Sequence, residues 1–158
     1  MSNFPKSYIM YKPRRSCDGC ASQWSISSKK DCVFLEMAKQ CGKTEDGNAK
    51  FDWDKKISFK LGDSDIGEIL SVLNGMKPAV GPFDSQKGKH KGLFHSNQNG
   101  NSVLYFGKDD QGVLRIHLSV KRSDQPNICV ASHNITIGES CILKTILERA
   151  VVVCYNWN

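Results

Sequence analysis

A six-residue pattern occurs twice in this chain, each time where a strand pattern changes into a helix pattern. The first copy, LGDSDI, is Leu61–Ile66 and the second, IGESCI, is Ile137–Ile142, at a constant offset of 76 residues. Each copy has an apolar residue, glycine, an acid, serine and, after one variable position, isoleucine. A junction repeated in this way predicts that the chain contains two copies of one supersecondary unit.

Alternating apolar and polar side chains precede the junction in both halves. In 112–122, for example, Leu114, Ile116 and Leu118 alternate with Arg115 and His117, which is typical of a half-buried strand. We expect strands at 8–11, 21–27, 32–38 and 55–61, and again at 92–96, 102–107, 112–122 and 133–137. The segment 41–50, CGKTEDGNAK, is predicted to be a solvent loop because its glycines and charges interrupt the pattern.

Helical spacing follows the junction in each half. Apolar residues three and four positions apart form one helix face, with Asp63 or Ser64 as the N-cap and Asn74–Gly75 as the end. The second helix carries its apolar residues near the C-terminus. The predicted apolar faces are Ile66, Ile69, Leu70 and Leu73 in the first helix, and Ile142, Ile146 and Leu147 in the second.

Each half therefore has the order β-β-β-β-α, which predicts an α+β fold with two four-stranded antiparallel sheets. A chain of 158 residues is the size of one domain, so we expect a single domain over residues 1–158, with repeats at about 7–75 and about 91–157. One face of each sheet packs on a helix, and the other face and several edges stay uncovered. We expect a partner to bind there.

The formal net charge of +6 is unevenly distributed. Residues 1–43 hold eight Lys or Arg against three acids and residues 84–122 hold seven against three, whereas 44–76 holds four against seven. Two basic segments separated by an acidic one favour a basic surface and a polyanionic partner. The alternative is that the lysines only keep the protein soluble.

Aromatic and basic side chains are interleaved on the expected strands, as single-stranded nucleic acid requires for its bases and phosphates. The alternative for each aromatic residue is a place in the core; Trp53 is expected to be structural. The predicted phosphate contacts are Lys12, Arg14, Arg15, Lys91, Arg115, Lys121 and Arg122; the predicted stacking residues are Trp24, Phe34, Phe94 and Tyr105; His117 is expected on the same exposed face as Arg115.

The seven cysteines are an odd number in mostly apolar segments, which favours a reducing intracellular compartment, the cytoplasm or nucleoid. No secretory signal or membrane-spanning stretch is evident. Cys17 and Cys20 form one C-x2-C pair that could be half of a zinc site with Cys32 and Cys41, but a lone pair is a weak signal. No catalytic motif is present, and QKGKHKG at 86–92 is expected to be a flexible basic loop that contacts phosphate. We therefore expect no metal, no cofactor and no enzymatic activity.

The segment FDWDKKISFKLGDSDIGEILSVL at 51–73 resembles the Whirly family of single-stranded DNA-binding proteins. The similarity extends to VFLEMA at 33–38, IHLSV at 116–120 and the C-terminal region 134–157, so it covers nearly the whole chain. The residues that match the family pattern are Asp52, Trp53, Lys56, Phe59, Leu61, Ile66, Gly67, Leu70 and Ser71.

The resemblance implies two four-stranded sheets packed crosswise and helices that assemble protomers into a homotetramer. It also implies that single strands bind along sheet edges with little sequence preference, in DNA replication, recombination, repair or transcription. The positive-cofactor-four coactivators and the kinetoplastid guide-RNA-binding proteins share the general fold, so RNA is the alternative ligand. The plant proteins have a Lys-Gly-Lys-Ala-Ala-Leu segment where this chain has YKPRRSCDGCASQW at 11–24; only Lys12 and Ala21 match there.

Overall fold

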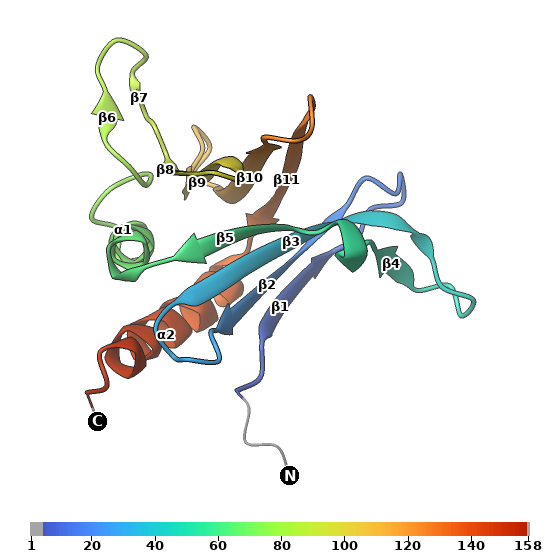
Figure 1. The fold of residues 1–158 in the computed structure, drawn as a ribbon, viewed down its shortest axis with the longest axis horizontal. Coiled ribbons are helices and arrows are strands. Elements are labelled where there is room, and N and C mark those ends of the chain that lie inside the picture. The colour runs from blue at the N-terminus through green and yellow to red at the C-terminus, as the bar shows by residue number, and fades with distance from the viewer. Residues whose placement is uncertain (1–4, 158) are drawn as a thin grey trace.

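The computed structural model describes residues 5–157, and both halves have the expected order of elements (Figure 1). Each half forms an antiparallel meander that is followed by a helix. The first half contains β1 (Tyr8–Lys12), β2 (Cys20–Ile26), β3 (Val33–Lys43), β5 (Ile57–Leu61) and α1 (Asp63–Leu73), and the second contains β8 (Leu93–Asn97), β9 (Gly100–Lys108), β10 (Leu114–Arg122), β11 (Ile128–Ile135) and α2 (Ile137–Cys154).

Two hairpins lie where the sequence predicts loops. The long strand β3 continues past a bulge at Gln40/Gly42 and pairs with β4 (Ala49–Phe51), so the first sheet has five strands. A 3-10 turn, η1 (Trp53–Lys55), then leads into β5. The predicted flexible loop at 86–92 is instead part of a small hairpin of β6 (Phe83–Asp84) and β7 (Lys89–His90). Strands as short as β4, β6 and β7 have too few residues to show a periodic side-chain pattern. Their pairing depends on hydrogen bonds to the neighbouring backbone.

The helix caps show which residues correspond in the two halves. The N-cap of α1 is Gly62, whose N–H donates to Asp65 Oδ2 at 3.0 Å, so neither Asp63 nor Ser64 is the cap. The N-cap of α2 is Thr136, whose N–H donates to Glu139 Oε1 at 2.9 Å. Asp65 and Glu139 are 74 residues apart, so the sequence match at 76 is displaced by two residues from the structural correspondence. The carboxylate at the third helical position defines the junction, because it satisfies the N–H of the cap residue.

The two sheets and both helices share one hydrophobic core. The inward faces contribute Trp24 and Phe59 from the first sheet and Phe106 and Ile116 from the second, all at most 2% exposed. On α2 the prediction is wrong for Ile142, which is 49% exposed. The buried face of α2 is Leu143, Leu147 and Ala150.

The helices lie next to each other at one end of the sheets, and the sheets diverge away from them (Figure 1). Within residues 5–157, no helix has both the length and the apolar character needed to cross a bilayer.

Candidate nucleic-acid interface

The side of the second sheet that faces away from the core carries rings and cations. On β10, Ile116 and Leu118 are fully buried, whereas Arg115 is exposed and His117 half-buried. The neighbouring strands alternate in the same register, because His117 pairs with Tyr105 on one side and Ser132 on the other. We call this surface the outer face; its members are Phe94, Val103, Tyr105, Arg115, His117, Ser119, Lys121, Val130 and Ser132.

The apolar part of the outer face is a row across all four strands. Phe94 is 62% exposed and pairs with Val103, which lies opposite Ser119 and then Val130. Tyr105 lies in the next row and is half-buried. Burial and the nearby carboxylates of Asp109 and Asp110 raise the pKa of Tyr105. The phenol is therefore neutral at physiological pH and is a hydrogen-bond donor beside the exposed ring.

The cations lie at the two ends of the outer face. Arg115 Nε donates to Asn134 Oδ1 at 3.2 Å, which fixes the guanidinium on the sheet. Lys121 is six positions further along β10, about 20 Å away at the usual rise of a strand, and is exposed. The outer face thus places rings between two positive charges, an arrangement suited to bases flanked by phosphates.

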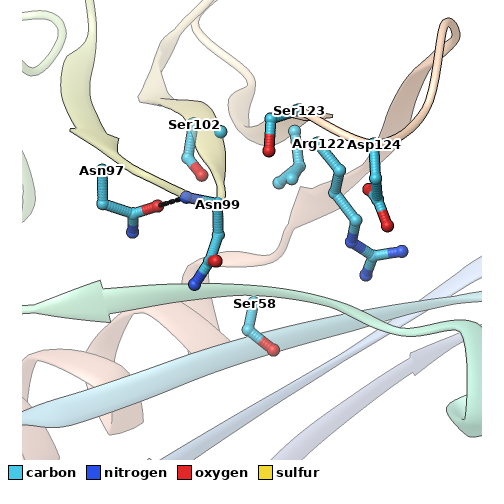
Figure 2. Close-up of a pocket in the computed structure, with 9 residues that line it drawn as sticks. Ser58, Asn97, Asn99, Ser102, Arg122, Ser123 and Asp124 are labelled. Atoms are coloured by element: carbon cyan, nitrogen blue, oxygen red, sulfur yellow. Dashed lines mark hydrogen bonds between the residues drawn. The ribbon is translucent and has the colours of Figure 1, made fainter.

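A second surface, the inter-sheet groove, consists of three hollows with one sheet on each wall. Their volumes are about 610, 200 and 300 Å³. Figure 2 shows the largest, where Asn97, Asn99 and Arg122 of the second sheet lie across from β5 at Ser58, whose side chain points away from them. The other two bring Lys39 and Lys55 beside Cys129 and Ala131 of β11, and Lys12 and Arg14 beside His133.

Two of the groove cations, Lys39 and Lys55, were not predicted from the sequence. The sequence does contain a signal for Lys39, because Lys39 continues the alternate positions Val33, Leu35 and Met37 that face inward. In the structure its side chain is exposed. Arg122 likewise continues the inward series of β10, and its Nη2 donates to Lys56 O at 3.4 Å. A cation that ends an inward apolar series marks the point where two sheets separate.

The predicted phosphate contacts are distributed over several surfaces. Arg115 and Lys121 lie on the outer face and Arg122 in the groove, whereas Arg15 is exposed on the β1–β2 turn and Lys91 lies just after β7. Lys12 and Arg14 also line the groove. However, Lys12 pairs with Glu139 at the start of α2, and Arg14 pairs with Asp18 at 3.6 Å, so their charges are partly compensated.

The predicted stacking residues also separate. Phe94 and Tyr105 lie on the outer face, and Phe34 is half-buried on the far side of the first sheet, between Ser25 and Lys60. The assignment of Trp24 as a stacking residue is wrong for this protomer, because the ring is 2% exposed within the core. Trp24 alternates with Ser25 on β2 and faces inward beside Leu35.

The cysteines do not converge. Cys17 is exposed, whereas Cys20 is buried, and burial raises the pKa of its thiol to about 11. Within residues 5–157, no three His, Cys, Asp or Glu side chains lie close enough together to hold a metal ion.

A buried hydrogen bond joins the two sheets beside the groove. His133 of β11 is 6% exposed, and its Nε2 lies 2.7 Å from Ser22 Oγ on β2. Its Nδ1 lies 2.8 Å from Asn134 O, so a neutral ring that donates through Nδ1 and accepts through Nε2 satisfies both contacts. Burial lowers the pKa of His133, with Lys12 acting in the same direction.

Acidification is expected to weaken the fold through His133. The folded pKa is below the unfolded value of about 6.5, so the unfolded state binds more protons. This contribution to stability is complete above about pH 6.5 and is lost as pH falls toward the folded pKa, with a slope of at most about 1.4 kcal/mol per pH unit. When urea unfolding is measured between about pH 5 and 8, the free energy of unfolding should depend less steeply on pH in His133→Gln than in wild type. His117→Gln, on the opposite face of the sheet, is the control, and equal slopes for wild type and His133→Gln would contradict the prediction.

Comparison with known proteins places the fold. No protein-family model matches the sequence, and no curated protein matches it significantly. The plant transcriptional regulator PBF-2 superposes with a TM-score of 0.70 at 20% identity, over 99% of this chain and 94% of that chain. WHY1 from Arabidopsis thaliana gives 0.68 at 20% identity, over 99% and 89%. A guide-RNA-binding protein complex bound to a guide RNA gives 0.65 at 16% identity, over 98% and 93%.

These similarities extend over nearly the full length of each chain, so they include both sheets and both helices. They agree with the repeated order of four strands and a helix, and they confirm the α+β architecture predicted from the sequence. The chain has the Whirly fold.

Proposed function

We propose that this protein binds single-stranded nucleic acid without catalysis and with little sequence preference. The observation that carries the proposal is the outer face, a four-stranded surface not covered by either helix that displays an exposed phenylalanine between an arginine and a lysine. Exposed apolar surface beside cations is what an unpaired strand needs, because its bases stack on rings while its phosphates approach positive charge.

In this proposal, bases stack on Phe94 and Tyr105, each contributing roughly 1 to 3 kcal/mol. Arg115 and Lys121 neutralise phosphates at the two ends, and His117 supplies a further polar contact. The inter-sheet groove, on the other side of the same sheet, offers Lys39, Lys55 and Arg122 as further phosphate contacts. Contacts to rings and phosphates do not read base edges, so the binding depends little on sequence.

Single-stranded DNA is the ligand that we favour, in replication, recombination, repair or transcription. The similarity to a plant transcriptional regulator supports transcription among these. RNA is the second candidate, favoured by the similarity to a protein complex bound to a guide RNA. Neither ring stacking nor phosphate contact distinguishes the two sugars, so a direct comparison of the two ligands is needed.

We also propose that the protein is a homo-oligomer, with a tetramer favoured. The exposed apolar side chains of α2 include Ile137, 85% exposed, and Ile142, 49% exposed. Beside the same helix lies a hollow of about 460 Å³ whose lining includes Trp24, Ile146 and Val153. Apolar side chains concentrated along one helix support burial against further copies of the chain.

Titration tests the proposal directly. Fluorescence anisotropy with matched single-stranded DNA, RNA and duplex should show preference for the single strands. The affinity should fall with salt at a log–log slope of about −0.7 per neutralised phosphate, or about −3.5 per protomer if Arg115, Lys121, Lys39, Lys55 and Arg122 all take part. Preference for duplex, or no binding at low salt, would overturn the proposal.

A further inference from the structure

The hairpin of β6 and β7 lines a basic hollow that is separate from the outer face except at Tyr105. The hollow has a volume of about 700 Å³ and is lined by Asp84, Lys87, Lys89, His90, Lys91 and Tyr105. Three of these residues are lysines, all exposed, against one acid. The carboxylate of that acid, Asp84, already accepts from the N–H groups of Gln86, at 3.0 Å, and Lys87, at 3.3 Å, within the turn.

The hairpin is rigidly attached to the second sheet. Val80 is fully buried, and its N–H donates to Phe106 O at 3.0 Å. Gly81 has φ of +86°, and a Cβ there would lie 2.1 Å from Gly92 O, so the two legs of the hairpin cross in contact. His90 Nδ1 lies 2.8 Å from Gly81 O across the same crossing. The lysines are therefore carried by an ordered support.

A second attachment joins the hairpin to α1. Glu68 Oε1 accepts from the N–H of Gly81 and from Lys77 Nζ, each at 2.8 Å. Lys77 Nζ also donates to Gly81 O at 3.2 Å. These bonds lower the pKa of Glu68, Lys77 first, although burial opposes them. Helix, hairpin and sheet are thus held in one arrangement.

Tyr105 connects the hollow to the outer face, because it lines the hollow and also lies beside His117 in the outer-face row. We propose that the hollow is a second phosphate-binding site, which takes the sugar–phosphate backbone of a strand leaving the outer face and so lengthens the bound segment. This inference rests on the proposed function. Lys87, Lys89 and Lys91 supply the charge, and the neutral phenol of Tyr105 donates to a phosphate oxygen.

The test replaces Lys87, Lys89 and Lys91 by glutamine in the full chain and compares two oligothymidylates of about 8 and about 20 nucleotides, lengths chosen from the range of single-strand site sizes. The longer strand should bind about tenfold more weakly, with a salt slope smaller in magnitude by about two, because three cations are lost. The affinity for the shorter strand should change less than about threefold.

Two control variants complete the experiment. Glutamine at Lys29, Lys43 and Lys50, which are exposed on connections of the first sheet or on its short hairpin, removes the same charge elsewhere and should leave the longer strand within about threefold of wild type. Arginine at the three hairpin positions should restore binding, because it keeps the charge.

Unchanged binding of the longer strand by the hairpin variant would overturn the inference while leaving the proposed function intact. Equal weakening of both strands, or an equal effect of the control triple, would also overturn it. If the wild-type protein bound neither strand, both the inference and the proposed function would fail.

Discussion

Replacement of both Phe94 and Tyr105 by alanine is expected to weaken binding of single-stranded DNA about 100-fold. Each stacked base contributes roughly 1 to 3 kcal/mol, and every 1.4 kcal/mol corresponds to a factor of about ten in affinity. Phe94 is 62% exposed and Tyr105 half-buried on the same face, so their removal leaves the core largely unchanged. Anisotropy titration at fixed salt measures the effect.

The matched control is Trp157→Ala. Trp157 is a larger ring and is 73% exposed, but it lies after the end of α2 and away from the outer face. The Trp157→Ala variant should therefore bind single-stranded DNA with an affinity within about threefold of wild type. If the double variant bound as tightly as wild type while keeping its melting temperature, stacking on the outer face would be ruled out.

Replacement of Trp24 by alanine is expected to destabilise the fold by about 3 to 5 kcal/mol, the usual cost of removing a large buried aromatic side chain. The ring is 2% exposed and belongs to the shared core with Leu35 and Phe59. Within residues 5–157, its Nε1 has no hydrogen-bond partner. Its loss should therefore remove packing without removing a polar contact. Urea unfolding measures the change in free energy.

Binding by the folded fraction of Trp24→Ala should remain within about threefold of wild type, because the ring does not reach the outer face. Phe34→Ala is the comparison, since Phe34 is only half-buried. It should lower the free energy of unfolding by less than half as much as Trp24→Ala. A loss of affinity without a loss of stability in Trp24→Ala would restore Trp24 as a stacking residue.

The sequence was informative wherever periodicity decides structure. The alternation of Leu114, Ile116 and Leu118 with Arg115 and His117 predicted both the strand and its exposed side, and the structure agrees. The caps were less predictable, because Asp63 and Ser64 are both plausible caps, and the structure instead uses Gly62 with Asp65. Whether Ile142 is buried depends on how far a neighbouring element extends, which local sequence does not encode; in the structure it is exposed.

The candidate site was predictable one strand at a time but not as an assembled surface. Arg115 followed from the alternation of its strand, whereas the meeting of Lys39 and Lys55 with Ala131 depends on how two sheets separate. The hairpin hollow depends on a backbone crossing between Gly81 and Gly92. Both arise from contacts between distant segments. Trp24 could not be assigned from its residue type, because an aromatic side chain suits base stacking and burial in the core equally well.

The shared core has a consequence for synthesis on the ribosome. Trp24, Leu35 and Phe59 gain their apolar neighbours Phe106 and Ile116 only after the second half is translated. At about 5 to 20 residues per second, the nascent first half waits on the order of ten seconds with this surface uncovered. Stalled translation after α1 would therefore leave an aggregation-prone fragment for chaperones rather than a functional half-protein.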